Sequence, residues 1–417
     1  MSKDVVIIGG GVIGLCTAYY SMLKGHRVTV VDRGPPDHDC CSLGNAGLIV
    51  PSHFVPLAAP GMVALGLQMM LNPEGAFSLR PRLSWELYDW AWKFFRASTA
   101  SHVNRAAPVL RDLSMASRRC FEEFSEISGD DFCFAKRGLL VLCRTERAFM
   151  HESSLATYAK GLGIETEVLN PEETARLEPG LEMSIIGSVY FPIDCHLSPE
   201  RFMKRITREL ERGGVQFLWN TEISGWRTSG RRITGGRTGE EDLAADEFVL
   251  AGGVWSPRLA RQLGLAIPMQ AGKGYSLTIE NPKRMPEICS ILHEARIAVT
   301  PMGSSLRFAG TMEIAGINPS VNPARVRGML NSIAKYFPEF DEQEFKNTPV
   351  WSGLRPCSPD GLPYVGRTLR YENLSIAAGH AMLGLSLGPV TGKLMGEILS
   401  GETPSIPIEL LGPDRYG

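Results

Sequence analysis

The sequence lacks a strong excess of either charge, because 43 lysines and arginines are balanced by 45 acidic residues and leave a formal net charge of −2. This balance gives no electrostatic reason to expect nucleic acid as a partner. The sequence also lacks a long apolar run. The longest one, Leu57 to Leu71, is interrupted by Pro60 and Gly61 and is shorter than the ~20 residues that a membrane-spanning helix needs. We therefore expect no transmembrane segment.

Cysteine patterns typical of metal sites are also missing. The nine cysteines are scattered, and the adjacent pair Cys40 and Cys41 cannot form a zinc knuckle by itself. Reduced thiols are the better interpretation, and we expect no metal site. The first apolar run, at Val5, passes directly into a glycine turn, which is not the pattern of a signal peptide. These absences favour a cytoplasmic protein.

The most informative motif lies near the start of the chain. An apolar run, Val5 to Ile8, leads into a glycine-rich turn, and a second apolar run ends at Asp32. This order of strand, glycine turn, helix, strand and acid is typical of a βαβ dinucleotide-binding unit. Gly9 makes the tight turn, Gly11 lets the backbone approach a pyrophosphate, and Gly14 lets the helix pack closely on the strand. Asp32 can accept hydrogen bonds from a ribose 2′-hydroxyl, which favours FAD or NAD over NADP.

Three further segments indicate a long cofactor that both ends of the chain contact. They are the small-residue loop 42–47, the apolar strand 247–251 with the glycine pair after it, and the turn 379–386 before a final helix. Amides at the start of that helix would stabilise negative charge on the N1/O2 edge of a flavin. An NAD enzyme has no need for this C-terminal segment, so the prediction is FAD. The predicted FAD-binding residues are Gly9, Gly11, Val12, Ile13, Gly14, Asp32, Arg33, Ser42, Asn45, Ala46, Gly47, Ile49, Ile223, Gly252, Gly253, Trp255, Gly353, Gly379, His380, Leu383, Gly384, Leu385 and Ser386.

A second motif, Trp351 to Gly366, contains Arg355 between a leucine and a proline. The arginine precedes the flavin-facing segment, and its planar guanidinium matches the geometry of a substrate carboxylate. The alternative is a structural arginine that caps a carbonyl or pairs with an acid.

The segment Trp85 to Phe95 has the length of a helix and is heavily aromatic. We expect it to pack into the core, with docking on a membrane surface or a partner subunit as the alternative.

Over essentially its full length, the sequence resembles the D-amino acid dehydrogenase small-subunit family, within the wider D-amino acid oxidase and glycine oxidase superfamily of flavoproteins. The resemblance rests on the runs 44–47, 58–61, 273–279, 309–316, 353–361 and 379–384. It implies a discontinuous FAD-binding domain and a substrate domain with a mixed, largely antiparallel sheet. It also implies that Arg355 anchors the substrate carboxylate and that the hydroxyl of Tyr275 makes a second contact.

The sequence departs from two related subfamilies. Glycine oxidase-like members carry an arginine soon after the Gly-His motif, where this chain has Ala381 and Met382. Sarcosine oxidase-like members attach the flavin through a cysteine near Gly353, where this chain has none. Cys357 lies a few residues later and is interpreted as a packing residue, so we expect noncovalent FAD.

The predicted fold class is α/β. Residues 1–60, 197–266 and 348–417 are assigned to a Rossmann-like FAD-binding domain, and residues 61–196 and 267–347 to the substrate domain. His53, His293 and Met382 are candidate substrate-pocket residues. The alternative for both histidines is an ordinary surface or core position.

The predicted function is FAD-dependent oxidative deamination of a D-amino acid, including cyclic ones such as D-proline or 4-hydroxy-D-proline. Hydride leaves the substrate Cα for flavin N5, the imine hydrolyses to a 2-oxo acid, and a quinone or partner protein takes the electrons. No His–Asp pair near these motifs indicates a dedicated base. The alternatives are an oxidase that reduces O₂ to hydrogen peroxide, a non-catalytic FAD-binding subunit of a larger complex and, least favoured, an NAD-dependent dehydrogenase. Peripheral association with the inner face of the membrane is a second option for its location.

Overall fold

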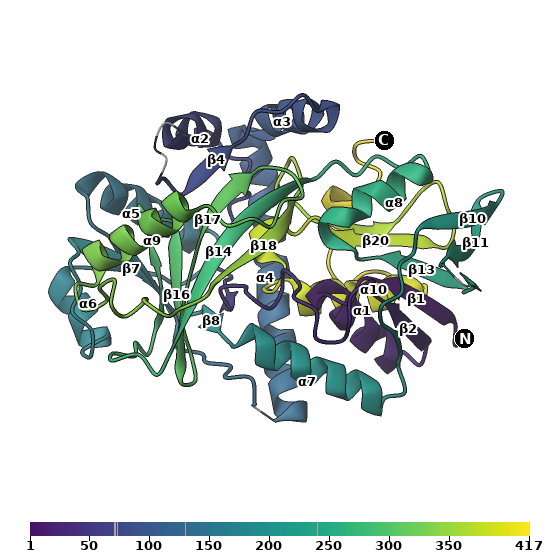
Figure 1. Ribbon diagram of the computed structural model, residues 1–417, viewed down its shortest axis with the longest axis horizontal. Coiled ribbons are helices and arrows are strands. Elements are labelled where there is room, and N and C mark those ends of the chain that lie inside the picture. The colour runs from purple at the N-terminus through teal and green to yellow at the C-terminus, as the bar shows by residue number, and fades with distance from the viewer. Residues whose placement is uncertain (71, 73, 130, 240) are drawn as a thin grey trace.

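Two sheets lie side by side in the computed structural model, which describes residues 1–417 except 71, 73, 130 and 240 (Figure 1). The first sheet and both chain termini lie in the right half of the view, and the second sheet lies in the left half. Helices surround both sheets, so the molecule is an α/β protein as predicted.

The first sheet has the dinucleotide motif at its centre. Its strand order is β19-β20-β13-β1-β2-β9, and its neighbours run parallel except for β19 against β20. Apolar residues on successive positions of β1 and β13 are buried on both faces, as expected for central parallel strands. The strands are β1 (Asp4–Ile8), β2 (Arg27–Val31), β9 (Gln216–Leu218), β13 (Glu247–Leu250), β19 (Tyr364–Arg367) and β20 (Leu374–Ala378).

Helices from distant parts of the chain cover one face of this sheet. They are α1 (Val12–Leu23), α4 (Ala100–Ser128), α7 (Pro199–Arg212) and α10 (Gly388–Leu399), and they share a core with Val5 and Ile7. A Cβ atom on Gly392 of α10 would lie 2.3 Å from the carbonyl oxygen of Cys16 in α1, so these two helices approach closely only because of the glycine. The opposite face packs against α8 (Ser256–Gln262) and a small sheet of β10 (Gly225–Ser229), β11 (Arg232–Arg237) and β12 (Asp242–Leu243).

The second sheet is mixed and largely antiparallel, with the order β18-β14-β17-β16-β15-β5-β7-β6. Only β5 with β15 and β4 with β17 pair in parallel within the described residues. The strands are β4 (Phe77–Leu79), β5 (Leu139–Cys143), β6 (Glu167–Leu169), β7 (Gly187–Phe191), β14 (Gln270–Glu280), β15 (Cys289–Leu292), β16 (Ile297–Met302), β17 (Ser305–Ile314) and β18 (Val350–Cys357). Its helices are α5 (Glu146–Gly161), α6 (Pro171–Leu177) and α9 (Pro323–Tyr336).

Two helices, α2 (Met62–Met70) and α3 (Trp85–Ala97), lie at the top of Figure 1, and α3 contains the aromatic segment. Only one side of α3 packs as expected: Leu87 and Trp90 are buried, and the Trp90 indole donates to the Cys357 carbonyl oxygen at 2.8 Å. On the opposite side Trp85 is 80% exposed and Trp92 is 59% exposed, so the predicted packing into the core applies to one side of the helix. No helix among the described residues combines the length and the apolar character needed to cross a bilayer.

The strands of the first sheet come from the three segments assigned to the FAD-binding domain. Two elements cross the predicted domain bounds. β18 falls in the segment 348–417 but pairs with β14 of the second sheet, and α4 falls in the segment 61–196 but contributes to the core of the first. The remaining short elements are β3 (Leu48–Ile49) paired with β8 (Cys195–His196), and the 3₁₀ turns η1 (Gly253–Trp255), η2 (Ala381–Leu383) and η3 (Glu409–Leu411).

Candidate functional site

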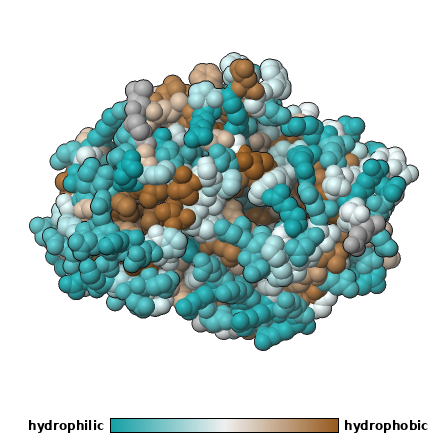
Figure 2. Space-filling view, viewed as in Figure 1, coloured by the Kyte–Doolittle hydropathy of each residue, from teal (hydrophilic) through white to brown (hydrophobic). Residues whose placement is uncertain are grey.

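A cavity of about 1030 Å³ lies where the two sheets meet. The carboxyl ends of the parallel strands β1, β2 and β20 line one side of it, which is where open α/β sheets bind their ligands. Strands β16, β17 and β18 of the second sheet line the other side, and α2 and α3 border it. The surface is hollowed near the centre of this face, with apolar residues inside the hollow (Figure 2). This volume is at the upper end of the ~300–1,000 Å³ typical of small-molecule sites and suits a long cofactor together with a substrate.

The glycine turn shapes the nucleotide end of the cavity. Gly9 has a φ of +119°, and a Cβ there would lie 2.5 Å from the carbonyl oxygen of Ala251, so only glycine fits. Gly11, the N-cap residue of α1, lines the cavity, and its nearest non-local neighbour, the Ser42 hydroxyl, would be at ordinary contact distance from a Cβ. The N-terminus of α1 is therefore open to an anion, as a pyrophosphate requires.

Asp32 binds two backbone amides of this turn region. Its carboxylate accepts from the Gly10 N–H at 2.7 Å and from the Gly34 N–H at 2.8 Å. A carboxylate has about four lone-pair positions, so it retains capacity for the ribose hydroxyl predicted for it. Farther along the cavity, the Arg33 guanidinium lies 4.0 Å from the centre of the Trp255 ring, and both residues line the wall.

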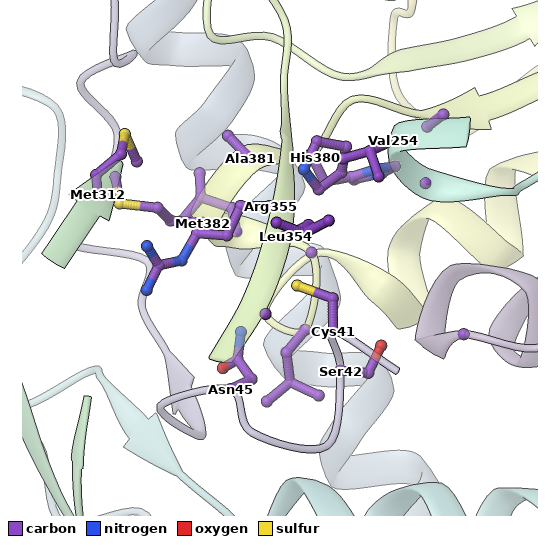
Figure 3. Close-up of a pocket in the computed structure, with 18 of the residues that line it drawn as sticks. Cys41, Ser42, Asn45, Val254, Met312, Leu354, Arg355, His380, Ala381 and Met382 are labelled. Carbon is purple, nitrogen blue, oxygen red and sulfur yellow. The ribbon is translucent and has the colours of Figure 1, made fainter. Parts of the chain in front are cut away.

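The turn around η2, which precedes α10, forms the cavity wall opposite the loop 42–47 (Figure 3). In η2, Ala381 has a φ of +47°, and the turn places His380, Leu383 and Ser386 on the cavity. His380 donates or accepts through Nε2 at 2.9 Å from the Thr391 hydroxyl, while its Nδ1 is buried without a partner among the described residues. Burial lowers the pKa of His380 to about 3, so its ring is neutral. An unpartnered polar atom beside a glycine-lined cavity is a position that a flavin would satisfy.

Most of the residues predicted to bind FAD line this cavity, and four do not. Gly14 packs on the Gly9 carbonyl, as its predicted packing role requires, and Ile49 is buried in β3. Gly47 and Gly379 have φ of +76° and +79°, which favours glycine, and neither lines the cavity. The residues that line it are Gly9, Gly11, Val12, Ile13, Asp32, Arg33, Ser42, Asn45, Ala46, Ile223, Gly252, Gly253, Trp255, Gly353, His380, Leu383, Gly384, Leu385 and Ser386.

Arg355 reaches the cavity from β18 by passing over Gly274 of the neighbouring strand. A Cβ on Gly274 would lie 2.1 Å from Nη2 of Arg355, so the glycine makes room for the guanidinium. Nη1 donates to the carbonyl oxygen of Thr311 at 2.6 Å. Arg355 and Leu354 leave the strand on opposite sides, and the guanidinium lies toward Met312 (Figure 3).

The half-buried guanidinium of Arg355 lacks a counter-ion within the described part of the chain, because no carboxylate there lies within 4.0 Å of it. Partial burial lowers its pKa, yet an arginine in a protein stays protonated. A partly desolvated cation without an anion is unfavourable, so the site is suited to bind one.

Tyr275 lies on the opposite face of the sheet. Because successive side chains of a strand alternate, the residue after Gly274 points away from Arg355. The Tyr275 hydroxyl donates to the Glu313 carboxylate and accepts from the Asn322 N–H at 3.0 Å, and the residue is absent from the cavity wall. The structure therefore does not bring Tyr275 together with Arg355. This corrects the expectation that the Tyr275 hydroxyl makes a second contact with the substrate.

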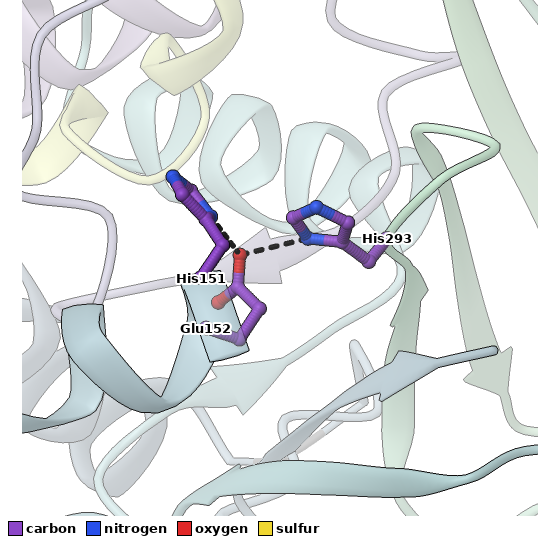
Figure 4. A group of neighbouring side chains, drawn as sticks. All are labelled: His151, Glu152 and His293. Atoms are coloured by element: carbon purple, nitrogen blue, oxygen red, sulfur yellow. Dashed lines mark ion pairs between the residues drawn. The ribbon is translucent and has the colours of Figure 1, made fainter. Parts of the chain in front are cut away.

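Two of the three candidate pocket residues, His53 and Met382, line the cavity, whereas His293 does not. Nδ1 of His293 donates to Glu152 Oε1 at 2.8 Å, and His151 Nδ1 lies 3.6 Å from the same oxygen (Figure 4). Burial alone would raise the pKa of Glu152, but the hydrogen bond from His293 and the nearby histidines lower it below its usual value. In each of these three residues, one nitrogen or oxygen atom is of the kind that can bind a metal, and these atoms all lie within 4.8 Å of one another. The positions of the cysteines in the sequence give no sign of this group.

Several cavity residues carry no local signal in the sequence. Cys41 lines the cavity below Leu354, and burial raises its pKa to about 12, so it is a neutral thiol. Trp351 and Met312 come from β18 and β17, and Arg296 from the turn between β15 and β16. Each reaches the site through sheet pairing, which the sequence pattern alone does not specify.

Comparison with known proteins agrees with this geometry. A family model described as FAD dependent oxidoreductase matches residues 4–398. The chain belongs to the FAD-dependent oxidoreductase family. It is 34% identical over 417 residues to the D-amino acid dehydrogenase of Granulibacter bethesdensis, covering 99% of each chain. It is 32% identical over 423 residues to the D-amino acid dehydrogenase of Bradyrhizobium diazoefficiens, covering 99% of this chain and 98% of the other.

Solved structures of this oxidoreductase fold are also similar. The glycine oxidase of Bacillus cereus superimposes with a TM-score of 0.77 at 23% identity, covering 98% of this chain and 97% of the other. The L-proline dehydrogenase of P. horikoshii gives a TM-score of 0.75 at 18% identity, covering 100% and 98%. At these identities the likeness shows the fold alone. Family and fold together confirm the predicted FAD-dependent oxidoreductase with a Rossmann-like domain.

Proposed function

We propose that this oxidoreductase is a D-amino acid dehydrogenase that oxidises its substrate to an imine and passes the electrons to a quinone or another acceptor that is not oxygen. Water then hydrolyses the imine to a 2-oxo acid and ammonia, whereas a proline-like substrate leaves a cyclic imine. The names of the full-length relatives support the substrate class. The observation that carries the proposal is the half-buried guanidinium of Arg355 at the cavity wall, which has no counter-ion among the described residues.

In this proposal Arg355 binds the substrate carboxylate through charge-assisted hydrogen bonds. Its remaining donors are available, because within the described residues only Nη1 is hydrogen-bonded, to Thr311. Bound FAD supplies the oxidant, since its N5 accepts the hydride that leaves the substrate Cα. The contribution of the protein is to hold the carboxylate so that the Cα–H bond faces the flavin, and such positioning carries a large share of the rate in oriented reactions.

The wall around Arg355 supports a substrate with a small apolar or cyclic side chain. The thioethers of Met312 and Met382 lie beside Arg355 (Figure 3), and Leu57, Ile291 and Ala298 line the same cavity. Apolar atoms at these positions favour burial of a methyl group or a pyrrolidine ring over a charged side chain.

An apolar surface beside the cavity supports a quinone as the acceptor. We call it the α2–α3 surface: Leu67, Leu83, Trp85, Tyr88, Trp92 and Phe95, all exposed by more than half. Other residues of α2 and α3, among them Met69, Trp90 and Phe94, line the cavity, so the surface is continuous with it. An apolar acceptor, or the bilayer that dissolves it, would bind such a patch. Peripheral association with a membrane is part of this proposal.

The cysteines support noncovalent FAD. Cys357 is fully buried and absent from the cavity wall, and burial raises its pKa to about 11. Its thiol points to the Arg355 carbonyl oxygen, 3.6 Å away, which is a packing position. Denaturation of the purified protein should therefore release all of its flavin into the filtrate.

An anaerobic screen of D- and L-amino acids, including the cyclic ones, tests the proposed function through loss of the flavin absorbance. We expect D-amino acids to bleach the flavin and their L-enantiomers to leave it oxidised. Arg355→Leu should raise KM about 100-fold or more while FAD stays bound, and Arg355→Lys should lie between, because lysine keeps the charge but not the planar fork. Unchanged kinetics in Arg355→Leu would refute the anchor role.

Two alternatives are separated by the same preparation. Rapid mixing of reduced protein with oxygen distinguishes a dehydrogenase, which reoxidises slowly, from an oxidase that releases hydrogen peroxide. A flavin that no amino acid reduces would instead identify a non-catalytic FAD-binding subunit.

A further inference from the structure

Three side chains form a hydrogen-bonded array that runs from the core to the cavity wall. Ser52 donates twice to Asp194: its backbone N–H to Oδ1 at 3.1 Å and its hydroxyl to Oδ2 at 2.5 Å. The same hydroxyl oxygen lies 3.0 Å from Nδ1 of His53. Asp194 is fully buried between β7 and β8, whereas His53 lines the cavity.

The segment that contains His53 is fixed beside the turn 381–386, which precedes α10. The Val50 N–H donates to the Ser386 hydroxyl at 3.1 Å, and Phe54 is buried in a cluster against which Leu383 packs. His53 is thus held between two buried neighbours, next to residues that line the predicted flavin position. Its ring faces the same cavity as Arg355.

The hydrogen bonds of Ser52 determine which ring nitrogen of His53 carries the proton. While the Asp194 carboxyl is ionised, the single hydrogen of the Ser52 hydroxyl is donated to it. The contact with His53 then requires Nδ1 to be the donor and the Ser52 oxygen to be the acceptor. A neutral imidazole with a proton on Nδ1 has a free electron pair on Nε2. The array therefore leaves Nε2 of His53 able to accept a proton.

We propose that His53 is the base that takes the proton from the substrate ammonium group, and that Ser52 and Asp194 hold its ring in the tautomer that can do so. In this role His53 is a catalytic residue, and the other two are positioning residues. The inference rests on the proposed function, because it assumes that an amino acid binds at Arg355.

The proton transfer is needed because an ammonium nitrogen has no free electron pair. One N–H bond of the substrate breaks, its electron pair stays on nitrogen, and the proton forms a bond to Nε2 of His53. That pair then forms the C=N bond of the imine as the Cα hydride leaves with its own two electrons, for which FAD is the oxidant. His53 returns its proton to water before the next turnover. A positioned base of this kind contributes about 10²–10⁴-fold to a rate.

The charges around His53 keep it neutral near pH 7. Burial lowers the pKa of His53, Glu152 from α5 raises it, and Arg296 from the turn between β15 and β16 lowers it, so that the pKa falls below its ordinary value. Asp194 faces it through Ser52, and burial raises the pKa of that carboxyl to about 7 against the bonds from Ser52 and the charge of Arg118. The carboxylate of Glu152 is itself bound between two further histidines (Figure 4).

The kinetic test follows anaerobic flavin reduction by D-alanine and D-proline between pH 6 and 10. We expect His53→Gln to slow reduction about 10²-fold at pH 7. The deficit should shrink as the pH rises, because the variant must wait for substrate that has already lost its proton in solution. Binding of α-aminoisobutyrate, which has the carboxylate and ammonium but no Cα–H, should be unchanged. His151→Gln is the matched control, since His151 is exposed in the same region and does not line the cavity.

A spectroscopic test needs no turnover. In protein labelled with [¹⁵N]histidine, the His53 signals, assigned by their loss in His53→Gln, should show a protonated Nδ1 and a bare Nε2 at pH 9, where the Asp194 carboxyl is ionised. Ser52→Ala should give a mixture of the two tautomers and a smaller loss of rate than His53→Gln. If His53→Gln loses FAD, His53→Asn and Ser52→Ala carry the same test.

The outcomes separate this inference from the proposed function. If D-amino acids reduce the wild-type flavin and the pH profile of His53→Gln runs parallel to that of wild type, the base is another group and the proposed function stands. A proton on Nε2 of His53 in the wild-type protein would also overturn the inference. If no D-amino acid reduces the wild-type flavin, the proposed function fails and this role for His53 fails with it.

Discussion

Gly274→Ala is the sharpest test of how the strand pairing positions Arg355. The Cβ added at residue 274 would lie 2.1 Å from Nη2 and 2.3 Å from Cζ of Arg355. Ordinary carbon contacts begin near 3.5 Å, so the guanidinium must withdraw by about 1.5 Å. It can do so because it is the end of a flexible side chain, and the backbone of β14 need not move.

The displacement breaks the 2.6 Å hydrogen bond from Nη1 to the Thr311 carbonyl oxygen and moves the guanidinium away from the substrate carboxylate. A hydrogen bond to a charged group is worth about 1.5–3 kcal/mol, which corresponds to roughly a 10- to 100-fold loss in kcat/KM. We expect this loss to appear mainly in KM, with unchanged FAD content and a melting temperature close to that of the wild type.

Steady-state kinetics with a D-amino acid, together with thermal unfolding, measure both effects. Gly161→Ala is the matched control, because a Cβ there meets nothing within 4 Å and Gly161 is exposed at the end of α5. Wild-type kcat/KM in Gly274→Ala would refute the assignment of Arg355 as the carboxylate anchor. An equal loss in both variants would point to a general effect of the substitution instead.

Three further predictions concern stability and the acceptor. Arg415 binds Asp360 through two hydrogen bonds of 2.8 and 3.0 Å, so Arg415→Met should lower the free energy of unfolding by about 3–5 kcal/mol in urea titrations. Burial alone would raise the pKa of Asp360, but Arg415 lowers it. The resulting stabilisation is complete above the unfolded-state pKa of about 3.9 and is lost as the pH falls through the lower folded value, so wild-type stability should fall toward that of Arg415→Met between pH 5 and 2. Trp92→Gln should raise KM for a short-chain quinone severalfold and leave anaerobic flavin reduction unchanged; equal quinone kinetics would show that the α2–α3 surface is not the acceptor site.

The dinucleotide motif was predictable because its determinants are local. The turn at Gly9, the close packing at Gly14 and the acid at Asp32 all lie within one βαβ unit, and the structure places them as the spacing requires. The α/β class followed from the same unit, and the resemblance to flavoproteins implied a second domain with a mixed sheet. The one-sided packing of α3 could not be predicted, because the number of aromatic residues does not say which of them face water.

The substrate side depended on sheet register, which the sequence does not specify. Arg355 pairs with Gly272, so Gly274 is two residues away from direct register with it, and only the glycine lets the arginine side chain cross. Once Arg355 lies on that face, strand alternation places Tyr275 on the other. His53 was identified as a pocket candidate, but Asp194, the partner of Ser52, is 142 positions from that serine, so no sequence motif could suggest the array.

The order of the strands in the first sheet has a consequence for how the protein is made. β1 ends at Ile8, but its neighbour β13 begins at Glu247 and the next strand, β20, begins at Leu374. At about 5–20 residues per second, β1 waits on the order of tens of seconds for these partners after it has left the ribosome. The cofactor cavity is complete only when η2 and α10 have been synthesised. Flavin therefore binds in its final site only after that point, and the unpaired edge of β1 is exposed to aggregation until β13 has been made.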